Sequence, residues 1–153
     1  MEKKPKVLFL STGNATRSQM AEGYLRSLAG DKFEAASAGI EATSLNPLAV
    51  EVMNEVGVDI SRQKAKNVKE SLKEHFGYVI TVCDSARERA PVFPFTPFLG
   101  HWSIYDPETA PDHPEEKRNV FRRVRDEIRA KVESFIGEAE KKKPDLAKTA
   151  KAR

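Results

Sequence analysis

The chain has 153 residues, which suffices for one domain with a hydrophobic core and is too few for two domains of ordinary size. Hydrophobic residues make up 39% and charged residues 32%, a balance that excludes wholesale disorder. The longest apolar run near the start, residues 7–10, is too short for a signal peptide or a membrane span. We therefore expect a cytoplasmic protein that does not contact a membrane.

The net charge of +3 does not indicate a nucleic-acid binder, because the positive charge is concentrated at the end of the chain. Residues 141–153 carry six basic side chains and one acidic side chain, a net charge of +5, which leaves residues 1–140 at −2. A slightly acidic body lacks the basic surface that nucleic-acid recognition requires. We expect one domain over residues 1–140 and a basic, disordered tail over residues 141–153.

The apolar pattern of the first thirty residues predicts a strand, a loop and a helix. Residues 7–10 form a continuous apolar run, which is typical of a strand in a sheet that is covered on both faces. After a loop, four apolar residues recur at helical spacing: Met20, Tyr24, Leu25 and Leu28. Gly30 is placed to end this helix in a left-handed conformation.

The next fifty residues repeat this alternation. Residues 33–38 predict a short strand, and residues 47–56 predict a helix that Gly57 closes. A weaker helix is expected over residues 68–76. The β-branched residues of the segment 78–82 then predict a third, buried strand, and Cys83 and Asp84 fall at its carboxyl end.

The remaining elements follow from the prolines and from a second apolar stripe. Residues 84–98 contain three prolines and several charged residues, which predicts a loop, and residues 98–104 predict a fourth strand. The clearest helix begins at Pro114, with Asp112 or His113 as its cap. Its apolar residues follow the helical period: Val120, Phe121, Val124, Ile128, Val132, Phe135 and Ile136.

Strands that alternate with helices predict a single α/β domain with a four-stranded parallel sheet and helices on both faces. In such a fold, ligands bind outside the carboxyl ends of the strands. Three loops are expected to meet there, over residues 11–18, 84–98 and 105–113.

The loop over residues 11–18 follows a buried strand and opens a helix, where backbone N–H groups and the helix dipole attract an anion. Gly13 and Asn14 are residue types that tolerate the unusual backbone angles of such a cradle. Arg17 can clamp two oxygens of a bound oxyanion. The loop therefore predicts a site for a tetrahedral oxyanion, formed by Ser11, Thr12, Gly13, Asn14, Ala15, Thr16, Arg17 and Ser18.

The segment VLFLSTGNATRSQMAEG, residues 7–23, resembles the thioredoxin-coupled arsenate reductases, which share the low-molecular-weight tyrosine phosphatase fold. The resemblance extends to about residue 138. Its other parts are Ser37-Ala38-Gly39, residues 79–84, His101-Trp102-Ser103 before Asp106-Pro107, and residues 121–128. It implies arsenate or phosphate as the bound oxyanion and thioredoxin as a protein partner.

The resemblance also implies roles for single residues. Ser11 occupies the position of the family's nucleophilic cysteine. Arg17 would bind the oxyanion, and Asp106 would protonate the leaving oxygen as a general acid. Asn14 would hold the loop in shape, and Ser18 would form a hydrogen bond with residue 11.

Two of the three thiol positions that the resemblance implies lack a cysteine. Cys83 matches the thiol that attacks the first cysteine, whereas Ala90 stands where the last thiol would close a disulfide. A serine hydroxyl starts several pKa units above the ~8.5 of a cysteine, so attack by Ser11 is expected to be very slow. We therefore expect oxyanion binding with impaired catalysis.

Several interpretations stay open. The chain is an arsenate reductase whose cysteine was replaced by engineering or by natural divergence, or it is a non-catalytic oxyanion-binding pseudo-enzyme. A phosphatase-like hydrolase ranks lower, because Glu108 follows Asp-Pro where the family's phosphatases commonly have an aromatic residue. Cys83 can also be an inert cysteine at the end of a buried strand. No metal or organic cofactor is expected, since His75, His101 and His113 show no metal-ligand spacing.

Overall fold

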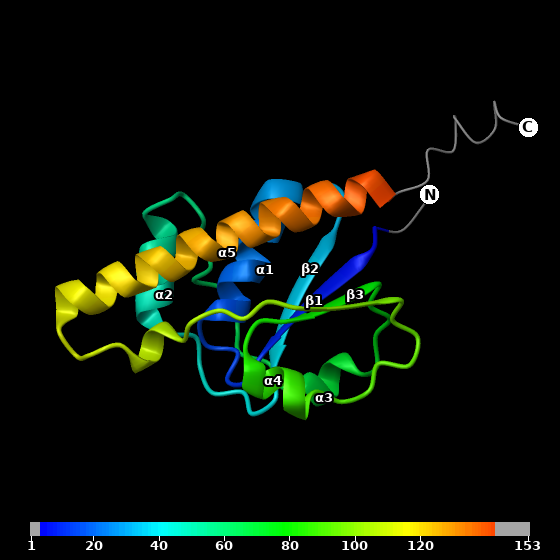
Figure 1. Cartoon of the computed structure of the whole chain (residues 1–153), viewed down its shortest axis with the longest axis horizontal. Helices are drawn as coiled ribbons and strands as arrows, with labels where there is room; N and C mark the ends of the chain where they lie inside the picture. The colour runs from blue at the N-terminus through cyan, green and yellow to red at the C-terminus, as the bar shows by residue number, and fades with distance from the viewer. Residues whose placement is uncertain (1–3, 143–153) are drawn as a thin grey trace, which may run out of the picture.

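The computed structural model describes residues 4–142, which form a parallel sheet between two layers of helices (Figure 1). The strands are β1 (Lys6–Ser11), β2 (Glu34–Gly39), β3 (Tyr78–Thr81) and β4 (Phe98–His101). Their order in the sheet is β2-β1-β3-β4, and all three neighbouring pairs are parallel. The prediction of a single α/β domain with a four-stranded parallel sheet is confirmed.

The helices lie on both faces of this sheet. One face carries α1 (Arg17–Ala29), α2 (Pro47–Asn54) and α5 (Pro114–Lys142), and the other carries α3 (Val68–Ser71) and α4 (Asp84–Arg89). A short 3-10 turn, η1 (Pro107–Thr109), precedes α5. Among residues 4–142, no helix is long and apolar enough to cross a membrane.

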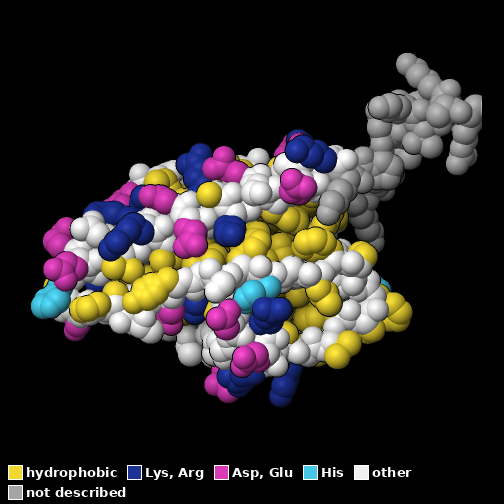
Figure 2. Space-filling view, viewed as in Figure 1, with side chains coloured by type: hydrophobic (Ala, Val, Ile, Leu, Met, Phe, Trp, Pro, Cys, Tyr) yellow, Lys and Arg dark blue, Asp and Glu magenta, His cyan; other side chains and the backbone are white. Residues whose placement is uncertain are grey.

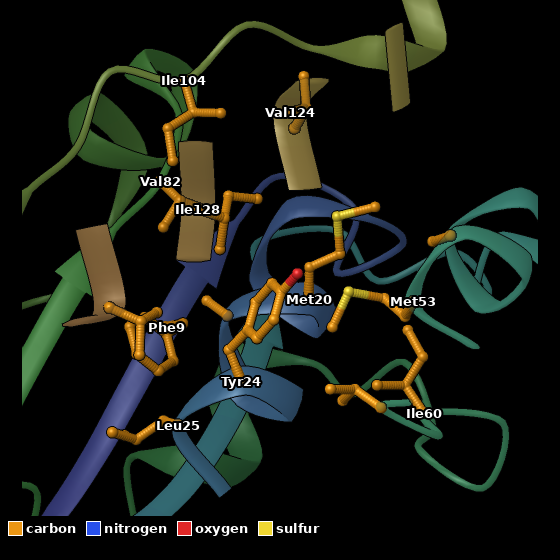
Figure 3. Close-up of a cluster of buried hydrophobic side chains, with 14 of the residues drawn as sticks. Phe9, Met20, Tyr24, Leu25, Met53, Ile60, Val82, Ile104, Val124 and Ile128 are labelled. Atoms are coloured by element: carbon orange, nitrogen blue, oxygen red, sulfur yellow. The ribbon is translucent and has the colours of Figure 1, made fainter. Parts of the chain in front are cut away.

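Alternating side chains of β1 enter two separate cores, which explains the continuous apolar run at this strand. Val7 and Phe9 belong to the larger core under α1 and α5. Leu8 and Leu10 belong to the smaller core beside α3 and α4. The close-up in Figure 3 shows that Tyr24 of α1 also lies in the larger core. Because β1 is buried on both faces, it places the loop that follows it at the centre of the sheet's carboxyl edge.

The segment 84–98, predicted to be a loop, begins with the helix α4. Asp84 stands in the first helical turn, where its charge suits the helix dipole, and Ala86 is buried against the sheet. The helix ends at Arg89 because Ala90 precedes Pro91 and has the extended backbone, ψ 138°, that a following proline favours. The charged residues that indicated a loop are the solvent face of this helix.

Other element boundaries also differ from expectation. The helix expected over residues 68–76 ends at Ser71, so His75 lies beyond it and its ring packs 5.9 Å from the ring of Phe95. The strand expected over residues 98–104 ends at His101, because Trp102 turns into the core against Phe9. Helix α5 continues to Lys142, so residues 141 and 142 of the predicted tail are helical, and residues 143–153 lie outside the described residues.

The two glycines that were expected to end helices behave differently. Gly57 has φ 78°, the left-handed conformation that closes the turn after α2. Gly30 was wrongly expected to be left-handed, since its φ and ψ of −64° and −18° are helical. The chain leaves α1 through a further turn instead, in which the N–H groups of Lys32 and Phe33 donate to the carbonyl of Ala29.

The edge of the sheet at β4 carries exposed apolar side chains. In Figure 2, hydrophobic side chains gather at the lower right, where the segment between α4 and β4 lies. The most exposed large apolar residues there are Val92, Phe95 and Leu99. The edge strand is only four residues long, which limits pairing with other chains.

Ion pairs fasten α5 to the end of α2. Glu55 accepts hydrogen bonds from Arg122 Nη2 at 2.6 Å and from Arg125 Nη1 at 2.9 Å. Arg125 is buried and also donates to the carbonyl of Val52. The hydrogen bond and charge of Arg122, followed by those of Arg125, lower the pKa of Glu55 to about 2.

We expect this pair of helices to lose stability in acid. Because the pKa of Glu55 is lower in the folded chain than in the unfolded chain, its ionisation stabilises the fold above the ordinary glutamate pKa of about 4.3. That contribution disappears as the pH falls through about 2. Glu55→Gln should therefore lower Tm at pH 7 and have little effect near pH 2. The same loss of Tm at pH 7 and at pH 2 would show that the ionisation of Glu55 does not stabilise the fold. The control is Glu133→Gln, at an exposed position of α5.

Candidate functional site

The loop over residues 11–18 connects β1 to α1 and turns its carbonyl groups outward. Four of its carbonyl oxygens accept backbone hydrogen bonds from the segment 40–46, at 2.8–3.1 Å: those of Ser11, Thr12, Gly13 and Ala15. The carbonyl of Asn14 accepts from Gln19 Nε2 at 3.0 Å, and that of Thr16 from the N–H of Met20 at 2.9 Å. The N–H and C=O of one peptide unit point in opposite directions. The N–H groups of residues 12–17 are therefore directed away from these partners.

Asn14 is the centre of the hydrogen bonds inside the loop. Its backbone has φ 54°, in the left-handed region that asparagine tolerates. Its Nδ2 donates to Ser18 Oγ at 2.8 Å and to Ser37 Oγ at 3.0 Å. Its Oδ1 accepts from the N–H of Lys66 at 2.9 Å and from Gln19 Nε2 at 3.1 Å. Both ends of the buried amide are satisfied, which holds the turn in one conformation.

Gly13 was expected, with Asn14, to be a residue type that tolerates unusual backbone angles, and the structure uses this tolerance only at Asn14. Asn14 has a positive φ, whereas Gly13 does not. A Cβ at Gly13 would be crowded, since it would lie 3.0 Å from Thr43 Oγ1, which would have to shift by a few tenths of an ångström. Glycine at this position allows the segment 40–46 to approach the loop.

Ser11 lies at the base of the loop and is buried. Its Oγ accepts a hydrogen bond from the N–H of Asn14 at 3.0 Å and lies 2.6 Å from Ser18 Oγ. Either hydroxyl can donate in this bond, and Ser18 donates whenever the atom at position 11 carries no proton. The N–H of Asn14 and the hydroxyl of Ser18 can therefore both donate to an ionised atom at position 11, an arrangement that favours negative charge there.

A buried carboxylate lies behind the loop, and sequence reasoning did not find it. Ser37 Oγ donates to Glu22 Oε1 at 2.6 Å, and Glu22 also pairs with Arg26. Lys66 Nζ lies 3.7 Å from the same carboxylate. The position of Glu22, four residues after Ser18 on α1, is the only sequence signal of this contact. Because Ser37 gives its proton to Glu22, it can only accept from Asn14, which fixes the orientation of the Asn14 amide.

Gly39, at the end of β2, allows the loop to pack against the sheet. A Cβ on this residue would lie 2.9 Å from backbone atoms of three loop residues: Thr12, Gly13 and Asn14. Because these atoms belong to the backbone, no flexible side chain can move aside to make room. The loop requires glycine here.

Gly39→Ala is therefore expected to destabilise the protein by about 1–3 kcal/mol and to weaken phosphate binding. Thermal unfolding and phosphate titration measure the two effects. Gly137→Ala is the matched control, because a Cβ there meets nothing within 4 Å. In the interior of α5 that change should stabilise the helix by about 0.5–1 kcal/mol. If Gly39→Ala were as stable as the parent, the close approach of the loop to β2 would not constrain the fold.

A cleft of about 520 Å³ opens above the loop. Its lining comes from four separated parts of the chain: Thr12, Gly13, Ala15, Arg17, Thr43, Cys83, Asp84, Ser85, Asp106 and Glu108. The predicted residues Arg17, Cys83 and Asp106 are brought together here, although they are far apart in sequence. The lining residues that the sequence did not assign to the site are Thr43, Asp84, Ser85 and Glu108.

The predicted side chains contact one another within the cleft. Arg17 Nη2 lies 3.7 Å from Asp106 Oδ2, and Arg17 Nη1 donates to the carbonyl of Ile104 at 2.9 Å. Asp106 also caps η1 by accepting from the N–H of Glu108 at 3.0 Å. Cys83 Sγ lies 3.4 Å from Thr12 Oγ1. Of the predicted residues, Arg17, Asp106 and Cys83 thus place a cation, a carboxyl group and a thiol in the lining of the cleft above the loop.

Ala90 lies outside this cleft. It lines a neighbouring groove together with His101 and Leu99, between α4 and β4. Only the six residues of α4 separate Ala90 from Cys83. A side chain at position 90 would have to approach Cys83 across this short helix.

Comparison with known proteins identifies relatives of this chain. The sequence model of the family "low molecular weight phosphotyrosine protein phosphatase" matches residues 6–145. The chain is 43% identical over 132 residues to the arsenate reductase of Halalkalibacterium halodurans, which covers 86% of this chain and 95% of that protein.

Solved structures give the same relationship. A structure described as an arsenate reductase in the phosphate binding state has a TM-score of 0.77 at 30% identity, over 88% of this chain and 98% of that chain. The thioredoxin-dependent arsenate reductase of Corynebacterium glutamicum has a TM-score of 0.72 at 27% identity, over 93% of this chain and 65% of that chain. The chain thus belongs to the low molecular weight phosphotyrosine protein phosphatase family, in which it is a homologue of arsenate reductases.

Proposed function

We propose that this protein binds arsenate or phosphate in the loop over residues 11–18, as an arsenate reductase homologue with a serine at the nucleophile position. The observation that carries the proposal is the outward orientation of the loop's carbonyl groups. Six consecutive carbonyls, from residue 11 to residue 16, accept hydrogen bonds from the surrounding protein. The opposed N–H groups and the guanidinium of Arg17 form a cradle for a tetrahedral anion.

We propose that turnover is impaired because no general base contacts Ser11 within residues 4–142. Its hydrogen-bonding partners in the described structure are the N–H of Asn14 and the hydroxyl of Ser18, and neither can accept its proton as a base. The two donors would stabilise the thiolate of a cysteine at this position, because a thiol in such surroundings ionises near neutral pH. They activate a serine hydroxyl far less, since it stays protonated. Asp106 would supply the proton to a leaving oxygen, and Arg17 would hold the oxyanion in place.

Reduction of arsenate with thioredoxin would need thiols at positions 11, 83 and 90. Cys83 supports this role, since it lines the cleft and contacts Thr12. The likeness to a thioredoxin-dependent arsenate reductase supports thioredoxin as the reductant. With Ser11 and Ala90 in place, Cys83 has no cysteine with which to form a disulfide.

The proposal is tested by restoring both thiols. Ser11→Cys combined with Ala90→Cys is expected to reduce arsenate in a thioredoxin-coupled assay, whereas Ser11→Cys alone should not sustain turnover. Ser11→Cys combined with Ser61→Cys, at an exposed position away from the cleft, controls for an additional thiol. Turnover by the single Ser11→Cys variant with thioredoxin would show that residue 90 does not have the role proposed here.

A non-catalytic oxyanion sensor is the second candidate. It is favoured by one observation, the burial of Ser11 among hydrogen-bond donors with no base in contact. A phosphotyrosine hydrolase is less well supported. At the rim of the cleft, the residue after Asp-Pro is Glu108, whose carboxylate is bonded to Asn46 at 2.8 Å, rather than an aromatic side chain.

A further inference from the structure

The rim of the cleft carries an excess of negative charge. Three carboxylates line it, those of Asp84, Asp106 and Glu108, against the single lining cation Arg17. Asp106 has a role in the proposed mechanism, but Asp84 and Glu108 have none. Both are surface carboxylates, and both are anchored by specific hydrogen bonds.

Asp84 contacts His101, which in turn contacts Thr81. His101 Nε2 lies 2.9 Å from Asp84 Oδ1, and His101 Nδ1 lies 2.7 Å from Thr81 Oγ1. Thr81 is buried, and the side chain of His101 is only 18% exposed, whereas that of Asp84 is 74% exposed. An exposed carboxylate is thus fixed to the sheet through a largely buried imidazole.

The anchor holds in either charge state of the imidazole. A neutral His101 carries its proton on Nε2, donates to Asp84, and accepts from the hydroxyl of Thr81 at Nδ1. When Nδ1 is also protonated, Thr81 Oγ1 accepts from it and can turn its own proton to the carbonyl of Gly100, 3.4 Å away. Asp84 keeps its hydrogen bond in both cases.

Glu108 is fixed on the other side of the rim. Its Oε1 accepts from Asn46 Nδ2 at 2.8 Å, and the N–H of Asn46 donates to the carbonyl of Ala15 in the oxyanion loop at 3.0 Å. Asp84 follows Cys83, whose thiol contacts Thr12 of the same loop. Both carboxylates are therefore tied to the loop that would hold the anion.

We propose that Asp84, positioned by His101, is a specificity-determining residue that selects against oxyanion esters with an anionic leaving group. The inference rests on the proposed function, since it assumes that the loop holds the oxyanion. The ester group of a bound phosphomonoester would then extend into the cleft that Asp84, Asp106 and Glu108 line. A carboxylate on that group is repelled and an ammonium group is attracted, so the accepted class is inorganic oxyanions and esters with neutral or cationic leaving groups.

The expected effect is modest and measurable. One unit charge at roughly 8 Å in water changes the affinity for another by about twofold, and the effect is larger near a protein surface. Comparison of an anionic with a cationic ester doubles the free-energy difference. Removing the charge of Asp84 should therefore change the ratio of their Kd values by about fivefold at low ionic strength, and less in high salt.

The experiment compares 4-carboxyphenyl phosphate with 4-(aminomethyl)phenyl phosphate by calorimetry, with inorganic phosphate as the reference. It is made at pH 8 and low salt, where the first ester carries a carboxylate and the second an ammonium group. The unaltered protein should bind the cationic ester more tightly, and Asp84→Asn should reduce the ratio about fivefold. Glu133→Gln, on α5 outside the lining of the cleft, should leave the ratio unchanged.

His101→Gln tests the positioning role. It should reduce the same ratio only in part, because the carboxylate remains but is no longer fixed, and it should preserve phosphate binding. The inference would be overturned if the unaltered protein bound the two esters equally well, or if Asp84→Asn had the same ratio of Kd values as the unaltered protein. Neither outcome would contradict the proposed function. Failure of the unaltered protein to bind phosphate would contradict the proposed function and this inference together.

Discussion

Ser11→Cys is expected to convert the protein into an aryl-phosphate phosphatase, with a rate at least about a thousandfold above that of the unaltered chain. The N–H of Asn14 and the hydroxyl of Ser18 already converge on the side-chain atom at this position. A thiol there would ionise, because both donors, the loop N–H groups and Arg17 favour the thiolate. The measurement is release of 4-nitrophenol from its phosphate ester.

The matched control is Ser85→Cys, which places a thiol in the lining of the same cleft but away from its base. It should show no comparable gain, since only position 11 receives the two donors. No gain in Ser11→Cys would mean that the general acid Asp106 or the loop itself is also defective. Equal gains in both variants would show that the two donors at position 11 are not what activates the thiol.

Arg17→Ala is expected to weaken phosphate binding by about a hundredfold. Charge-assisted hydrogen bonds contribute roughly 1.5–3 kcal/mol, and the guanidinium is the only cation that lines the cleft in the described structure. Its removal also leaves the charge of Asp106 unopposed, which repels the anion further. Calorimetric titration with phosphate measures the loss.

Two further substitutions make this result specific. Arg17→Lys keeps the charge but not the planar fork, so it should restore only part of the affinity. Arg129→Ala removes an exposed arginine of α5 that pairs with Glu133, and it should leave binding unchanged. Phosphate affinity that is unaltered in Arg17→Ala would remove Arg17 from the site.

The fold was predictable because its signals are local. The apolar run of β1, the helical period of α5 and the alternation of strands with helices each occupy one stretch of sequence, and together they require a covered parallel sheet. Boundaries were less predictable where local and tertiary preferences differ. In α4 the charged residues and nearby prolines indicated a loop, but the burial of Ala86 against the sheet favours a helix.

The site was predictable only in part, for the same physical reason. The loop over residues 11–18 lies within one segment, so its glycine, asparagine and arginine could be interpreted directly. The partners that shape it come from elsewhere: the segment 40–46 that binds its carbonyls, and Glu22, which orients Asn14 through Ser37. Such contacts depend on how strands and helices pack, and a single sequence does not state them.

The most direct test of this account is calorimetric titration of the unaltered protein with phosphate and with arsenate, alongside arsenate turnover with thioredoxin. The account predicts saturable binding of one oxyanion per chain to the loop that includes Arg17, and no thioredoxin-dependent turnover while Ser11 and Ala90 are present. Absence of binding would contradict the assignment of the loop as an oxyanion site. Turnover would show that Ser11 or Cys83 performs chemistry that its surroundings do not support.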